Sequence, residues 1–170
     1  MTPETMGARQ ALTAATLLSR YGLTLATAES LTGGLVGQLV TSVAGASAFY
    51  VGGMITYATE AKSGVLGVDP AVLREQGPVS PEVARQMAAR VRVVFGASMG
   101  LATTGVAGPT EQDGNPVGML HVGIADATGT RAITLKGPDG SRAEVRAWAA
   151  QAALTELVGQ LLRTYAVEPA

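Results

Sequence analysis

The sequence predicts an α/β protein, a three-layer α/β/α sandwich around a mixed, mostly parallel sheet. Short apolar runs typical of strands alternate along the chain with longer segments whose apolar residues recur at helical spacing. The composition, 47% apolar but only 4% aromatic, favours helices packed closely on a sheet over a large aromatic core. Because 170 residues is close to the usual size of one domain, we expect a single domain over residues 1–170.

The first elements follow from periodicity and from one glycine. Residues 5–21 space their apolar side chains for one buried helix face, and Gly22 is a typical residue for ending that helix. Residues 23–28 form a short apolar run and are predicted to be a strand. A helix with one apolar face is predicted over residues 33–43, and a second strand over residues 52–57.

Two helices are indicated next by proline. Asp69-Pro70 and Ser80-Pro81 each resemble an N-cap followed by proline at the first helical position. We therefore expect a short helix from about residue 70 and a longer one from about residue 81 to Gly96. The largely apolar run over residues 97–103 is typical of a strand covered on both faces.

The C-terminal part reads as a loop, a hairpin and a helix. Residues 110–115 are polar with an Asp-Gly pair, so we expect a mobile loop. Residues 118–125 and 131–136 alternate as strands on either side of a turn, which predicts a hairpin and makes the sheet mixed. The last helix is predicted over residues 141–165.

Composition excludes several classes of function. The net charge of −1 leaves no basic surface for nucleic acid or an acidic membrane. Without cysteine the chain has no disulfide, thiolate zinc site or cysteine nucleophile. The carboxylates are scattered, so we expect neither a metal nor a cofactor. No apolar stretch has transmembrane length and the N-terminus lacks a signal-peptide pattern, so we expect a cytoplasmic protein without a membrane partner.

Two turns rich in small residues are the candidate functional segments, because ligands of α/β proteins bind beyond the carboxyl ends of strands. Residues 30–34 and residues 104–109 each follow a predicted strand. Ser30 or Thr32 could simply cap the helix that follows. Alternatively, the free N–H groups there receive an anion, either a phosphate or the oxyanion of a reacting carbonyl.

A serine nucleophile needs a base, and the chain offers few. The only histidine, His121, lies in the middle of a predicted strand, so we interpret it as structural. Lys62 could act as the base if burial keeps it neutral, although a solvated surface lysine is the alternative. Tyr57 could relay a proton, or it is simply a half-buried strand residue.

Five motifs follow one another along the chain. Thr-Ala-Glu-Ser-Leu-Thr-Gly-Gly stands at residues 27–34, and Thr56-Tyr57 precedes Glu60-Ala61-Lys62. The other three motifs are residues 77–80, residues 104–109 and Pro-Val-Gly at residues 116–118. Together, over roughly residues 7 to 163, they resemble the CinA C-terminal domain family. The resemblance implies nicotinamide-nucleotide amidohydrolase activity, which converts nicotinamide mononucleotide to nicotinate mononucleotide and ammonia.

The resemblance also implies roles for individual residues. Ser30 is the implied nucleophile, Lys62 its base, and Tyr57 a catalytic neighbour. The backbone N–H groups around residues 32–34 would then serve as oxyanion donors. These donors belong to Thr32, Gly33 and Gly34.

Substrate binding is expected from two further segments. Arg142 and Arg146 stand four residues apart at the start of the last predicted helix, so they share a face suited to a phosphate, or else form a solvated basic face. The turn after the 97–103 strand would shape the rest of the pocket. Its expected substrate-binding residues are Thr104, Gly105, Ala107 and Gly108.

This chain departs from the family pattern at two places. Leu31 stands where the family usually has cysteine. Residues 110–115 are acidic and polar where the family is richer in glycine and has a lysine before Pro-Val-Gly, which leaves the identity of the substrate open. A non-catalytic nucleotide-binding or competence-associated module is therefore the alternative function. The resemblance further implies a homodimer or higher homo-oligomer.

Overall fold

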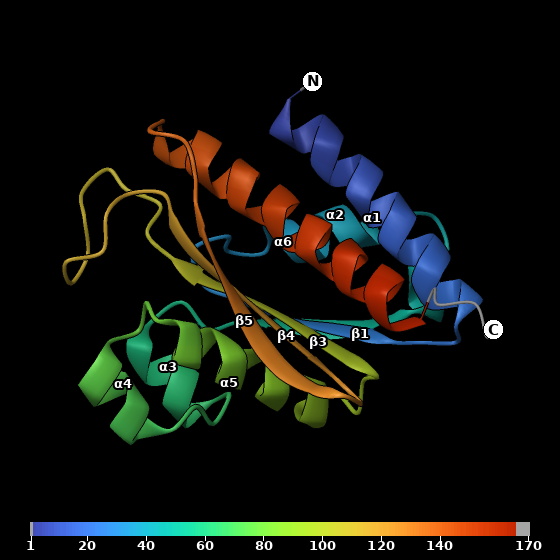
Figure 1. Cartoon of the computed structure of the whole chain (residues 1–170), viewed down its shortest axis with the longest axis horizontal. Helices are drawn as coiled ribbons and strands as arrows, with labels where there is room; N and C mark the ends of the chain where they lie inside the picture. Colours follow the sequence, from blue (N-terminus) through green and yellow to red (C-terminus); the bar gives the residue numbers. More distant parts are fainter. Residues whose placement is uncertain (1, 166–170) are drawn as a thin grey trace.

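Five strands form one mixed sheet in the order β2-β1-β3-β4-β5 (Figure 1). The structure is a computed structural model that describes residues 2–165. Strand β1 pairs in parallel with both β2 and β3, whereas β4 is antiparallel to β3 and to β5. Four strands thus point one way and β4 the other, which confirms the expected mixed α/β architecture. The strands are β1 (Leu25–Glu29), β2 (Tyr50–Ile55), β3 (Met99–Gly105), β4 (Met119–Asp126) and β5 (Gly129–Lys136).

Helices cover both faces of the sheet (Figure 1). On one face α1, α2 and α6 enclose one apolar core, and on the other α3, α4 and α5 enclose a second. The described helices are α1 (Pro3–Arg20), α2 (Leu35–Thr41), the 3₁₀ helix η1 (Ala46–Ala48), α3 (Thr59–Gly64), α4 (Pro70–Gln76), α5 (Pro81–Val94) and α6 (Arg142–Tyr165). None of the helices within residues 2–165 is long and apolar enough to cross a membrane.

Small residues let α5 lie unusually close to the sheet. A Cβ atom at Gly100 on β3 would stand 2.0 Å from the carbonyl oxygen of Ala88, and one at Gly123 on β4 would stand 1.9 Å from that of Ala84. Both distances are far below van der Waals contact, so the helix backbone rests directly on the two strands. This close packing explains why the second core needs so few aromatic side chains.

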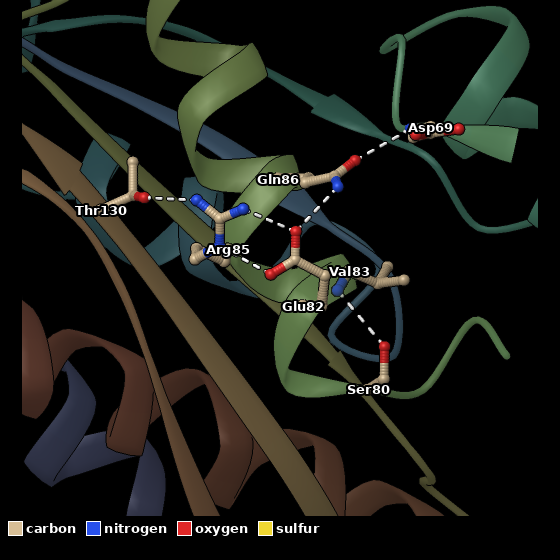
Figure 2. A network of polar contacts seen from close by, with 7 residues as sticks. All are labelled: Asp69, Ser80, Glu82, Val83, Arg85, Gln86 and Thr130. Atoms are coloured by element: carbon tan, nitrogen blue, oxygen red, sulfur yellow. Dashed lines mark hydrogen bonds and ion pairs between the residues drawn. The ribbon is translucent and has the colours of Figure 1, made fainter. Parts of the chain in front are cut away.

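Polar contacts fix both sides of the start of α5 (Figure 2). The hydroxyl of Ser80 caps the helix by accepting a hydrogen bond from a backbone N–H. Gln86 accepts a 2.9 Å bond from the backbone N–H of Asp69, which ties α5 to the start of α4. Arg85 donates a 2.9 Å bond to the hydroxyl of Thr130 on β5. The two prolines after Asp69 and Ser80 occupy first helical positions as predicted.

Two short elements differ from the expectations. Neither η1 nor the short helix α3, which carries Lys62, was predicted. The predicted hairpin is confirmed, because Asp126 and Gly129 pair across its turn. Residues 110–115 contain a small closed turn in which Gln112 and Asn115 exchange backbone hydrogen bonds of 3.0 and 2.8 Å. The expected mobility of that loop stays a prediction.

Candidate active site

A cavity of about 440 Å³ opens at the carboxyl ends of the parallel strands. Its lining comes from the segments that directly follow three neighbouring strands: Ser30 and Leu31 after β1, residues 57–59 after β2, and residues 106–108 after β3. Lys62 from α3 and Arg142 from the start of α6 are the two basic residues among the described residues of the wall. The topology therefore brings both small-residue turns to one site.

Ser30 and Lys62 are in direct contact inside this cavity. Ser30 is held at the end of β1 because its N–H donates a 3.0 Å hydrogen bond to the carbonyl of Thr103 on β3. The ammonium nitrogen Nζ of Lys62 lies 2.9 Å from Ser30 Oγ. Lys62 has only 1% of its surface exposed, so the alternative of a solvated lysine is excluded.

The other neighbours of Lys62 suit an amine that loses its proton. Nζ donates to the backbone carbonyls of Thr56 at 2.8 Å and of Tyr57 at 3.2 Å. A neutral amine keeps two N–H donors and one lone pair, so with two carbonyls bonded the lone pair is left for the Ser30 hydroxyl. Burial lowers the pKa of Lys62 to about 8, although the nearby Glu60 carboxylate opposes this shift. At pH 7 about a tenth of the Lys62 side chains are thus neutral, far more than for an exposed lysine.

Glu29, the last residue of β1, occupies the N-terminus of α2. Its buried carboxylate accepts hydrogen bonds from the backbone N–H groups of Gly34 at 2.9 Å, Val36 at 3.1 Å and Gly37 at 2.8 Å. The hydroxyl of Thr32 donates a fourth bond to it at 2.7 Å. The alternative in which Ser30 or Thr32 caps the helix is therefore excluded, and so is a phosphate cradle, because a carboxylate of the chain already fills the place of the anion.

The same contacts correct the expected oxyanion donors. The N–H of Gly33 donates to the carbonyl of Ser30 at 3.0 Å and that of Gly34 donates to Glu29, so neither is free for a substrate. Neither glycine lines the cavity, and Thr32 does not line it either. Within residues 2–165, the backbone N–H groups of Leu31 and Thr32 have no hydrogen-bond acceptor, and Leu31 lines the cavity. Of the four backbone N–H groups at residues 31–34, those of Leu31 and Thr32 are therefore the two without an acceptor in the described chain.

Arg146 and Arg142 do not act as a pair. The guanidinium of Arg146 donates to the carbonyl of Leu31 at 3.0 Å and to that of Thr32 at 2.9 Å, and it lies outside the cavity. The predicted phosphate contact of Arg146 is incompatible with this position. Arg142 lines the cavity, where it donates to the carbonyl of Gly108 at 2.6 Å and to the hydroxyl of Tyr57.

Tyr57 takes part through its backbone more than through its ring. Its side chain is 55% exposed, and its hydroxyl bonds to Arg142 rather than to Ser30 or Lys62. The backbone carbonyl of Tyr57 is the group that contacts Lys62. A proton relay through the tyrosine hydroxyl is therefore not supported by the contacts, whereas a role in orienting Lys62 is.

The end of β3 and the turn that follows it form another part of the cavity wall. Thr104, Gly105, Ala107 and Gly108 all line it, as expected. The hydroxyl of Thr104 donates a 2.7 Å bond to the carbonyl of Pro78, which joins β3 to the segment that leads into α5. His121 pairs with Thr104 across the sheet but lies outside the cavity, bonded to the hydroxyl of Thr134 at 2.9 Å. Burial lowers the pKa of His121, consistent with a structural role.

Comparison with known proteins decides the family. The sequence profile of the CinA C-terminal domain matches residues 8–161. The chain belongs to the CinA C-terminal domain family. A CinA-like protein of Frankia casuarinae is 49% identical over 148 residues, covering 86% of this chain and 33% of that protein. A CinA-like protein of Geobacter sulfurreducens is 45% identical over 149 residues, covering 87% of this chain and 36% of that protein. The chain thus spans about a third of the length of these curated relatives.

Solved structures agree on the CinA fold. The competence/damage inducible protein CihA from Agrobacterium tumefaciens superposes with a TM-score of 0.86 at 33% identity, over 91% of this chain and 94% of that one. The competence damage-inducible protein A from Klebsiella pneumoniae gives a TM-score of 0.89 at 30% identity, over 93% and 98% of the two chains. The α/β architecture is therefore that of the CinA family.

Several site features of this CinA-family chain were not anticipated from sequence. Glu29 was visible beside Ser30, and a carboxylate just before a glycine turn could have been recognised as a cap for the helix that follows. The carbonyl of Thr56, by contrast, carries no side-chain signal. Glu111 was seen only as part of a polar loop, yet it lines the cavity. Among residues 2–165, no group of three His, Asp or Glu side chains could hold a metal ion.

Proposed function

We propose that this protein is an amidohydrolase that converts nicotinamide mononucleotide to nicotinate mononucleotide and ammonia. The single observation that carries the proposal is the buried 2.9 Å contact between Lys62 Nζ and Ser30 Oγ at the wall of the cavity. A serine hydroxyl becomes nucleophilic only when a base removes its proton, and Lys62 is the base in contact with it. Membership of the CinA family supports the same reaction class.

Acylation would use both residues. Neutral Lys62 takes the proton from Ser30 Oγ, and the oxygen attacks the carboxamide carbon of the substrate. The resulting oxyanion is stabilised by the N–H groups of Leu31 and Thr32, which have no acceptor within the described chain. When the tetrahedral adduct collapses, its C–N bond breaks and the Lys62 ammonium gives its proton to the leaving nitrogen. Ammonia departs and an ester to Ser30 remains.

Deacylation repeats the proton transfers with water. Lys62, neutral again, takes a proton from a water molecule whose oxygen attacks the ester carbon. Collapse of the second adduct breaks the bond to Ser30 Oγ, which recovers its proton from Lys62. The product is released as a carboxylic acid, which gives its remaining proton to water and becomes the carboxylate. Lys62 therefore serves as base and acid in each half of the reaction.

The turn that carries Ser30 is held from two sides. Glu29 holds the N–H groups of the following helix, while Arg146 holds the carbonyls of Leu31 and Thr32. Because N–H and C=O point in opposite directions in a trans peptide, fixing the Leu31 carbonyl also fixes the direction of the Thr32 N–H. These contacts support a preorganised site for the oxyanion.

Arg142 is the proposed partner of the substrate phosphate. It is the only arginine that lines the cavity among the described residues, and its guanidinium is oriented by Gly108 and Tyr57. A guanidinium so placed can form two parallel hydrogen bonds to phosphate oxygens. The expected contribution of the turn at Thr104 to Gly108 is to shape the wall that receives the ring and ribose.

Ammonia release from nicotinamide mononucleotide tests the proposal. Ser30→Ala and Lys62→Ala should each abolish it while the far-UV circular dichroism stays native. Lys136→Ala, which removes an exposed lysine from β5, is the matched control and should keep full activity. Unchanged rates in the Ser30 and Lys62 variants would refute the assigned dyad. Binding of the nucleotide without ammonia release by the natural sequence would favour the alternative, a nucleotide-binding module.

A further inference from the structure

Glu111 places a carboxylate in the cavity wall. It is the only Asp or Glu among the lining residues of the described chain, where it accompanies the cations Lys62 and Arg142. No hydrogen bond or ion pair within residues 2–165 engages the Glu111 side chain. Its negative charge is therefore available to a molecule in the cavity.

The loop that carries Glu111 is anchored at both ends. On one side Arg142 holds the carbonyl of Gly108 at 2.6 Å. On the other, the side-chain amide of Asn115 reaches the carbonyl of Val79 at 3.5 Å, and the backbone groups of Asn115 pair with those of Gln112. The closed turn at Asp113 and Gly114, with φ of 50° and 77°, completes the loop. These contacts hold the residues on either side of Glu111, which lines the cavity.

The charge of Glu111 acts differently on two related pyridinium amides. Nicotinamide riboside carries a single positive charge on its ring, whereas nicotinamide mononucleotide adds a phosphate with up to two negative charges. A carboxylate in the wall attracts the first charge and repels the second. Arg142 acts in the opposite sense, so the balance between the two side chains sets the preference.

We propose that Glu111 is a specificity-determining residue that shifts the preference of this site from the phosphorylated nucleotide toward the unphosphorylated pyridinium nucleoside. This inference rests on the proposed function, because it concerns the same cavity and the same carboxamide. Glu111 is exposed, so its effect is screened by water and salt and is expected to be about three- to tenfold.

The test compares kcat/KM for ammonia release from the two amides. Glu111→Gln should raise the ratio of nucleotide to riboside about three- to tenfold, and the increase should shrink at high salt. Asp113→Asn is the matched control: it removes the same charge from the same loop, but residue 113 does not line the cavity. Asparagine also tolerates the positive φ at that position. The control should leave the ratio unchanged.

Equilibrium binding separates failure of this inference from failure of the proposed function. Calorimetric titration of Ser30→Ala, with and without Glu111→Gln, gives the affinity ratio of the two ligands when no turnover occurs. The expected result is the same three- to tenfold shift toward the nucleotide. An unchanged ratio, an equal shift in the Asp113 variant, or no binding of either ligand would overturn the role of Glu111. Absence of ammonia release with an altered binding ratio would overturn the enzymatic proposal alone.

Discussion

The Thr32 hydroxyl donates a 2.7 Å hydrogen bond to Glu29 Oε2, and in turn it contacts the hydroxyl of Thr103 at 2.8 Å. Because Thr32 donates to the carboxylate, Thr103 must be the donor in the second contact. A buried chain of polar groups thus runs from β3 through the serine turn to the start of α2. These contacts connect the turn that carries Ser30 to strands β1 and β3.

Replacing the carboxylate should loosen this turn. Glu29→Gln puts an amide NH₂ among groups that are all donors, so at least one buried N–H loses its acceptor. We expect a loss of about 2–4 kcal/mol in the free energy of unfolding, measured by urea titration, together with lower kcat. Glu144→Gln is the control, since Glu144 caps α6 through Ser141 but is exposed. An equal loss in both variants would contradict the buried role of Glu29.

The rate should depend on pH through Lys62. Only neutral Lys62 accepts the Ser30 proton, and burial sets its pKa at about 8. We expect kcat/KM for ammonia release to rise about tenfold per pH unit below that value and to level off above it. His121→Asn should leave the midpoint in place, because His121 lies outside the cavity. A midpoint that moves with this substitution would mean that another group controls the rate.

The same burial should make Lys62 costly for stability. The pKa of Lys62 falls from 10.5 in the unfolded chain to about 8 in the fold, so below pH 8 both states hold the proton and the full penalty acts. Lys62→Met removes this penalty of about 3 kcal/mol but also three hydrogen bonds of about 1 kcal/mol each, so at pH 7 its free energy of unfolding should lie within about 2 kcal/mol of that of the natural protein.

Between pH 8 and 10.5 the folded protein sheds the Lys62 proton while the unfolded chain keeps it, so the natural protein gains stability with rising pH. The free energy of unfolding of Lys62→Met relative to that of the natural protein should therefore fall by about 3 kcal/mol over that range in urea titrations at a series of pH values. Lys136→Met, at an exposed lysine, should show no such trend. A constant difference at all pH values would disprove the link to deprotonation.

Arg142 should affect binding of the phosphate. Arg142→Gln removes the only lining guanidinium of the described chain, so KM for nicotinamide mononucleotide should rise about tenfold or more with a smaller change in kcat. Nicotinamide riboside, which has no phosphate, should show little change in KM. Equal effects on both compounds would mean that Arg142 acts through the cavity wall and Tyr57 instead.

Arg146 should affect the chemical step. Arg146→Gln frees the carbonyls of Leu31 and Thr32, so the N–H groups proposed for the oxyanion lose their fixed direction. We expect kcat to fall about tenfold or more while KM changes little, in contrast to the Arg142 variant. Steady-state kinetics on both variants with the same substrate makes the comparison. A KM effect in place of a kcat effect would restore a binding role for Arg146.

Local pattern was enough to predict most of the elements. The strands and the long helices carry their periodicity within a few residues, and the Asp69-Pro70 and Ser80-Pro81 starts were confirmed. Helix α3 was missed because it has six residues and no side-chain N-cap. This helix carries Lys62. Burial in the folded protein lowers the pKa of Lys62, and the residues next to it in sequence do not reveal that burial.

The spacing of Arg142 and Arg146 along the helix predicts which face they share but not what each side chain contacts. Helical periodicity correctly puts Arg142 and Arg146 on one side of α6. The contacts of the two guanidinium groups depend on partners far away in sequence: Arg142 binds Tyr57, and Arg146 binds Leu31. In the same way, the sequence suggests that the backbone N–H groups of Gly33 and Gly34 are free for a substrate. In the structure the N–H of Gly34 donates to Glu29 instead. Backbone hydrogen bonding therefore decided which groups remain for the substrate.

The glycines beneath α5 also bear on how large a substrate can be. Pro78 and Val79, which lead into α5, line the cavity, and the height of that helix above the sheet is set by backbone contact at Gly100 and Gly123. A methyl group at either glycine would push the helix outward and carry this part of the wall with it. The width of the cavity can therefore change, in evolution or in the laboratory, without altering any residue that lines it.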